Sequence, residues 1–73
     1  MRYKIGDYVK IIMSKSKYSD DDIGKIGKII SDNGETNIYP YKVVFINYTK
    51  EFEYFDDEEI TKVTKDEVMV EML

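Results

Sequence analysis

The chain has 73 residues, a net charge of −4, and no cysteine or histidine. This length allows one small domain, and the missing residue types exclude disulfides, thiolate nucleophiles, imidazole bases and the usual zinc sites. No apolar run reaches the roughly 18 residues of a membrane span, and no apolar signal core is present, so we expect a cytoplasmic protein.

Alternating apolar residues predict a first strand from Tyr8 to Ser14, after a turn at Gly6-Asp7. The polar stretch from Ser14 to Asp22 predicts a loop, whose length marks it as a candidate functional loop. The acidic run at its end, residues 20–22, lacks the spacing of a calcium loop and predicts a solvated surface.

The next stretch is rich in isoleucine, which predicts a second strand from Lys25 to Ser31. Gly24 and Gly27 interrupt this pattern, and glycine within a strand marks a bulge, a tight bend or a close backbone approach. We expect one of them to adopt a conformation closed to other residues. The segment Asp32-Asn33-Gly34-Glu35 predicts a turn.

The second half predicts three further strands. The third runs from Tyr41 to Ile46 with Pro40 at its head, the fourth from Glu51 to Phe55, and the fifth from Ile60 to Thr64. Between the last two, the acidic run 56–59 is too charged to pack inside and predicts one exposed helical turn.

The tail, residues 65–73, has three interpretations, which are a short helix, a strand and disorder. Thr64 and Glu67 have the spacing of a capping box, which predicts a short helix. Read at a period of two, Val68, Val70 and Met72 share one face, which is typical of a strand.

The predicted core is made of the apolar positions Val9, Ile11, Ile26, Ile29, Val43, Phe45, Phe55, Ile60 and Val63. With the core filled by these residues, the seven tyrosines of the chain cannot all be buried. Tyrosine is enriched at recognition surfaces, so an exposed group of tyrosines indicates a binding site.

Residues 5–12 and 23–29 resemble the KOW pattern, in which Gly-Asp precedes the first strand and apolar-Gly-Lys-apolar-Gly follows the first loop. Residues 39–45 and 55–60 are similar to the small peripheral subunit of photosystem I and the variable chain of ferredoxin–thioredoxin reductase. The whole resembles the short YorP-like proteins of prophages. These resemblances imply an all-β, small five-stranded SH3-like barrel over residues 1–64, and a phage or mobile-element accessory protein.

Without a nucleophile–base pair we expect no enzyme, no metal site and no cofactor. We predict a non-catalytic module that binds a protein partner through three tyrosines with an acidic rim. In SH3-like barrels the first loop flanks the usual ligand groove. The predicted site consists of Tyr18, Tyr48, Tyr54, Asp20, Asp21, Asp57 and Glu58.

Two alternatives remain. A KOW-type nucleic-acid or ribosome-associated module would use the basic first part of the chain, through Lys10, Lys15, Lys17, Lys25 and Lys28. The net negative charge and the presence of Arg2 as the only arginine argue against nucleic acid. In the other alternative the role is structural, and the tails of two chains pair to form a weak homodimer. Otherwise we expect a monomer.

Overall fold

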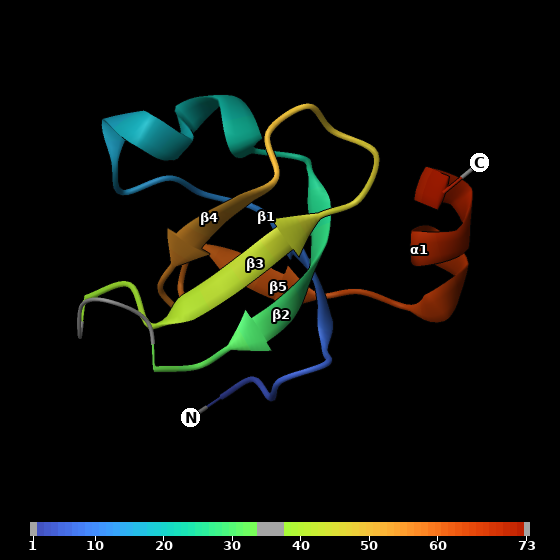
Figure 1. Cartoon of the computed structure of the whole chain (residues 1–73), viewed down its shortest axis with the longest axis horizontal. Helices are drawn as coiled ribbons and strands as arrows, with labels where there is room; N and C mark the ends of the chain where they lie inside the picture. Colours follow the sequence, from blue (N-terminus) through green and yellow to red (C-terminus); the bar gives the residue numbers. More distant parts are fainter. Residues whose placement is uncertain (1, 34–37, 73) are drawn as a thin grey trace.

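Five strands form one antiparallel sheet in the computed structural model, which describes residues 2–33 and 38–72 (Figure 1). The strands are β1 (Tyr8–Ile11), β2 (Ile26–Ser31), β3 (Tyr41–Phe45), β4 (Phe52–Phe55) and β5 (Ile60–Lys62). Their order is β4-β3-β2-β1-β5, so β4 and β5 are the two edges. All five strands were predicted. Closure of the sheet into an SH3-like barrel remains a prediction.

Two helices make the protein mostly β rather than all-β. The predicted first loop contains a 3₁₀ helix, η1 (Lys17–Asp22), and the tail forms α1 (Lys65–Met72). The Glu67 amide donates to the Thr64 hydroxyl oxygen over 3.3 Å, which confirms the helical interpretation of the tail and its cap. No helix in the described part of the chain is long and apolar enough to cross a membrane.

The acidic run before β5 forms one turn, closed by the Glu59 amide on the Asp56 carbonyl oxygen over 3.1 Å. Glu59 is fully buried, so the prediction that this run lies wholly outside is wrong at that residue. The predicted turn at residues 32–35 continues into residues 34 and 35, which lie outside the described part.

The register of the strands gives the sheet an inner and an outer face, because residues directly opposite each other share a face. Val9, Gly27 and Phe45 align on the inner face. One residue along each strand, Tyr8 aligns with Lys28, Lys28 with Val44, and Val44 with Phe52. We call this second side the outer face; its strand residues are Tyr8, Lys10, Ile26, Lys28, Ser31, Lys42, Val44, Phe52, Tyr54 and Thr61. The register shifts between Ile29 and Ser31, so Ile30 has no partner in β3.

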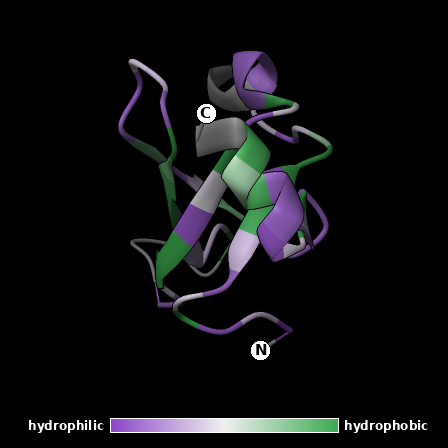
Figure 2. Cartoon of the chain, turned by 90° about the vertical axis from the view of Figure 1, so that its right-hand side faces the viewer, coloured by the Kyte–Doolittle hydropathy of each residue, from purple (hydrophilic) through white to green (hydrophobic). Residues whose placement is uncertain are grey.

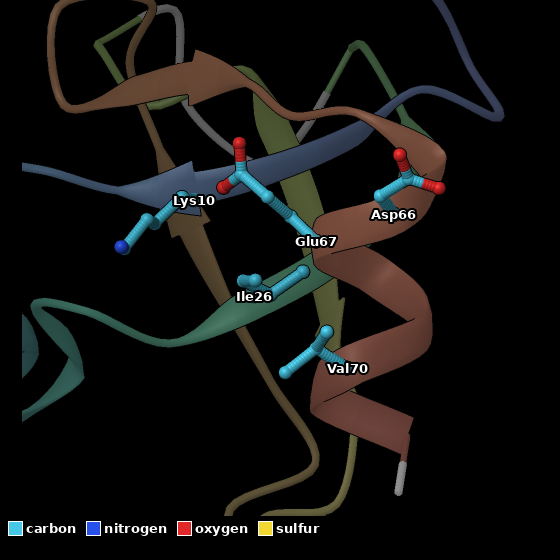
Figure 3. A pocket seen from close by; sticks show the side chains of 5 residues that line it. All are labelled: Lys10, Ile26, Asp66, Glu67 and Val70. Carbon is cyan, nitrogen blue, oxygen red and sulfur yellow. The ribbon is translucent and has the colours of Figure 1, made fainter.

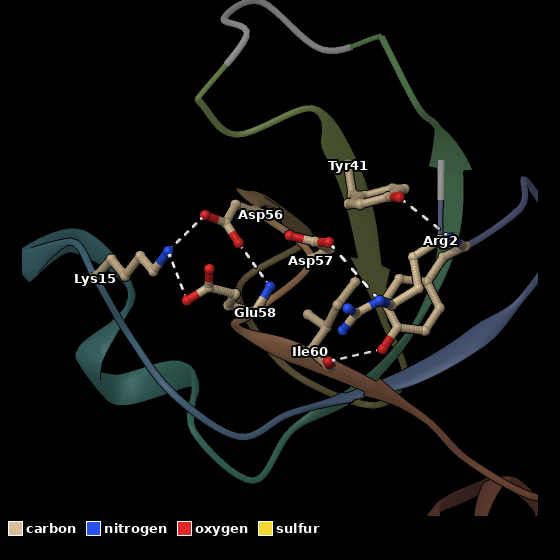
Figure 4. Close-up of polar contacts among 8 residues, drawn as sticks. Arg2, Lys15, Tyr41, Asp56, Asp57, Glu58 and Ile60 are labelled. Atoms are coloured by element: carbon tan, nitrogen blue, oxygen red, sulfur yellow. Dashed lines mark hydrogen bonds and ion pairs between the residues drawn. The ribbon is translucent and has the colours of Figure 1, made fainter.

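The core confirms eight of the nine predicted positions; Val63 is half-buried instead. Tyr41 joins the core at 1% exposure, although it was not among the predicted core positions. Its burial is satisfied because its hydroxyl accepts the Tyr3 amide hydrogen over 3.2 Å, and the two rings meet edge to face (Figure 4). The N-terminal segment is thereby held against the sheet.

The two glycines of the isoleucine-rich stretch serve different purposes. Gly24 has a φ of 96°, which side-chain-bearing residues rarely adopt. A Cβ on Gly27 would lie 2.5 Å from Val43 Cγ1 and 2.6 Å from the Val44 carbonyl oxygen. Gly24 thus provides the turn before β2, and Gly27 permits the close approach of β3, as the sequence predicted.

We expect Gly24→Ala to lower the free energy of unfolding by roughly 1–2 kcal/mol, because alanine is strained at this φ. We expect Gly27→Ala to lower it by roughly 1–3 kcal/mol, because the added methyl group overpacks the contact with β3. Asparagine tolerates positive φ, so Gly24→Asn should recover part of the loss whereas Gly27→Asn should not. Urea unfolding of the four variants measures both effects. Alanine variants as stable as the parent would contradict both assignments.

Candidate functional site

Two carboxylates are fully buried, Asp22 at the end of η1 and Glu59 before β5. The prediction that the acidic run ending at Asp22 is solvated is therefore wrong at that residue. Charged groups are buried when each oxygen finds a partner, and both carboxylates meet that condition. These two residues organise the polar contacts at one end of the molecule.

Asp22 forms ion pairs with two lysines. Its Oδ1 lies 2.8 Å from Lys25 Nζ and its Oδ2 lies 2.8 Å from Lys50 Nζ. The Lys25 ammonium also lies 5.1 Å from the ring centres of Phe45 and Tyr48. Burial opposes the charge of Lys50, but hydrogen bonds to Asp22 and Glu53 outweigh burial and raise its pKa. The cluster joins η1 to the β3–β4 connection.

Glu59 joins the loop after β1 to the turn before β5. Its Oε1 accepts the Asp56 amide and its Oε2 accepts the Lys15 amide, each over 2.9 Å. The Lys15 ammonium lies between the Asp56 and Glu58 carboxylates, at 2.8 and 3.2 Å (Figure 4). Hydrogen bonds to these carboxylates raise the pKa of Lys15. The arrangement fastens the loop after β1 to the turn before β5.

The predicted tyrosine site is divided among several places. Tyr48 belongs to the Asp22 cluster, whereas Tyr54 lies on the outer face beside Lys42. The side chain of Tyr18 lies outside the described part. The rim residues are also dispersed: Asp20 and Asp21 are exposed on η1, Asp57 lies 3.8 Å from Arg2, and Glu58 contacts Lys15.

The alternative lysine face is divided as well. Lys15 and Lys25 form ion pairs with acidic residues, and the Lys17 side chain lies outside the described part. Lys10 and Lys28 lie on the outer face, where Lys42 joins them. We did not single out Lys42 from the sequence, although its alternation with core residues of β3 was a usable signal.

The outer face carries a strip of lysines and aromatic rings that the sequence analysis did not assemble. We call it the lysine–aromatic strip; it consists of Tyr8, Lys28, Lys42, Val44, Phe52 and Tyr54. Lys42 Nζ lies 4.2 Å from the centre of the Phe52 ring, and Lys28 Nζ lies 5.8 Å from that of Tyr8. Phe52 is 41% exposed, so the strip presents apolar area to solvent.

Charge also distinguishes the outer face from the rest of the surface. Among the described strand residues that face outward, none is Asp or Glu. No ion pair within residues 2–33 and 38–72 involves Lys10, Lys28 or Lys42. The outer face is therefore positive, although the whole chain carries a net charge of −4.

A shallow pocket of about 350 Å³ lies where α1 meets the outer face (Figure 3). Its lining combines Lys10 and Ile26 of the sheet with Asp66, Glu67 and Val70 of α1. The described residues include no group of three or more acidic side chains that could hold a metal ion.

Comparison with solved structures finds chains of similar fold. The solution structure of Bacillus subtilis protein YorP is similar to this chain, with a TM-score of 0.65 and 25% sequence identity over 88% of this chain and 73% of YorP. No family model matches the chain, and no curated protein matches it. The predicted resemblance to YorP is thus confirmed in structure, while those to KOW modules and the photosynthetic subunits stay predictions.

Asp22→Asn should lower the free energy of unfolding by roughly 1.5–3 kcal/mol, because two lysines lose a charged hydrogen-bond acceptor. Asp21→Asn is the matched control, since Asp21 is exposed one position away. Urea unfolding compares the two. Equal midpoints for both variants would show that the Asp22 cluster does not stabilise the fold.

Asp56 generates a prediction on pH. Partial burial favours its neutral form, but hydrogen bonds from Lys15 and the Glu58 amide, together with the Lys15 charge, hold its pKa below the ordinary value. A lowered folded-state pKa stabilises the fold above the unfolded-state pKa, and this contribution is lost as pH falls through the folded-state pKa.

Asp56→Asn should therefore lower the melting temperature near about pH 7 and have a much smaller effect near about pH 2. Asparagine keeps a carbonyl oxygen for the Glu58 amide, so the substitution mainly removes charge. Circular dichroism melts across this range measure the difference, with Asp20→Asn as an exposed control. A difference that stays constant with pH would contradict the assignment.

Proposed function

We propose that this chain is a non-catalytic, cytoplasmic binding module that contacts a protein partner through the lysine–aromatic strip. The observation that carries the proposal is a row of side chains in register across four strands, in which lysines lie among half-buried rings and the exposed ring of Phe52. Recognition surfaces combine apolar rings with charged groups in this way.

The charged clusters around Asp22 and Glu59 support a structural role for the acidic residues in them. Lys15, Lys25 and Lys50 already contact carboxylates, so they are poorly placed to meet a ligand. The outer face, by contrast, offers ammonium groups without acidic partners in the described part of the chain.

Nucleic acid is the second candidate, because lysines beside exposed rings also suit stacked bases and phosphates. Lys10, Lys28 and Lys42 would supply the charge. Against this candidate stand the net charge of −4, the acidic Asp66 and Glu67 of α1 beside Lys10, and the scarcity of arginine. We therefore favour a protein.

The resemblance to YorP supports an SH3-like architecture and the idea of a phage or mobile-element accessory protein. This fold class serves many unrelated functions, so the likeness adds nothing about the ligand. The proposal on binding rests on the outer face alone.

Phe52→Ala and Tyr54→Ala should each weaken capture of the partner from a lysate of the encoding organism, by roughly 1–2 kcal/mol or more once the partner is purified. Met69→Ala is the control, since Met69 is 64% exposed on α1. Affinity capture followed by calorimetry measures the loss, after circular dichroism has verified the fold.

Two results would redirect the proposal. A loss confined to Met69→Ala would favour contacts through the tail, including a weak homodimer. Micromolar binding of single-stranded oligonucleotides that disappears in Lys28→Glu would favour the nucleic-acid candidate.

A further inference from the structure

The contact between α1 and the sheet shows which chemistry the outer face accommodates. Ile26 points to the outer face opposite Lys10, yet it is 5% exposed, and Val68 of α1 is 6% exposed. Glu67 and Val70 of α1 line one pocket together with Lys10 and Ile26 (Figure 3). An acidic and apolar helix thus lies beside an apolar and basic part of the sheet.

The helix α1 is too short to be stable without contacts to the rest of the protein. It has eight residues, and isolated helices of this length are marginal in water. In Figure 2, which looks onto α1, the helix combines hydrophilic and hydrophobic segments in front of the strands. Its docking therefore depends on the complementarity between Val68, the acidic first turn and the outer face.

The rest of the outer face repeats this chemistry without a cover. Lys28 and Lys42 take the place of Lys10, and Val44 and Phe52 provide apolar area where Ile26 does so beneath α1. Phe52 is 41% exposed. Charge complementarity points to carboxylates above these two lysines.

Strand addition at the β4 edge is a less suitable binding mode. The Tyr54 amide, on this edge strand, donates to Glu53 Oε1 over 2.9 Å. A side chain of the same strand thus occupies a backbone donor, which is one way in which proteins protect edges from pairing. The partner is better placed on the face than at the edge.

We propose that the lysine–aromatic strip binds a protein segment that presents carboxylates and apolar side chains together, as α1 does. This inference rests on the proposed function and adds the chemistry of the partner. The carboxylates lie beside Lys28 and Lys42, and the apolar side chains cover Val44 and Phe52.

The probes are two synthetic amphipathic helices, one with Glu and Leu on one face and the other with Lys in place of each Glu. We expect the Glu peptide to bind the full chain and to shift amide resonances of β2, β3 and β4. Lys28→Glu/Lys42→Glu should weaken this binding about tenfold or more and allow the Lys peptide to bind instead. Lys4→Glu, a lysine outside the strands, should change neither.

The outcomes separate this inference from the proposed function. Equal binding of both peptides, lost in Phe52→Ala, would overturn the acidic chemistry and leave a protein site on the strip. Failure of both peptides to bind would overturn the inference, and oligonucleotide binding at the same lysines would overturn the proposed function as well. Amide spectra of each variant establish that it is folded.

Discussion

The register between β2 and β3 is the constraint on which the rest of the structure depends. Gly27 lies opposite Phe45, and Ile29 lies opposite Val43, so the inner face of the sheet is apolar across its centre. A shift by one residue would exchange the two faces of a strand. The same register that buries Val43 therefore places the exposed Lys28 and the half-buried Val44 on the outer face. The register between β2 and β3 therefore determines both the core and the proposed binding surface.

The buried carboxylates solve a second problem, which is the attachment of long connections to a small sheet. A domain of this size has few apolar side chains to spare for its loops. Asp22 and Glu59 instead accept hydrogen bonds from ammonium and amide groups of segments distant in sequence. Such contacts give orientation more than net stability, because burial of charge is costly. The acidic residues at this end thus fasten loops.

The outer face shows how a sheet with one core can use its other side. Antiparallel sheets commonly bury one face and leave the other in contact with water. Here α1 covers Ile26, and lysine side chains lie over the rings of Tyr8 and Phe52. Lysines cover apolar surface with their stems while their charges stay in water. The exposed ring of Phe52 is thus partly screened from water.

Local sequence patterns were sufficient for the five strands and for a strained glycine in the isoleucine-rich stretch, since each depends on alternation or a turn. They left the tail open between helix and strand, and they did not tell which of Gly24 and Gly27 has the positive φ. They were insufficient for Tyr41, whose burial requires the Tyr3 amide, thirty-eight positions away in the chain. The predicted site depended on tyrosine and acidic residue types, and type alone does not tell which side chains meet.

The sequence by itself determined which residues could form strands and which face of each strand is apolar. Both follow from the alternation of side chains along a strand, which is a local property. The tertiary structure decided that Asp22 and Glu59 are buried, because their partners come from other segments. It also decided that Lys28, Lys42, Phe52 and Tyr54 share one surface. Their proximity follows from pairing between three strands, and no single stretch of the chain specifies that pairing.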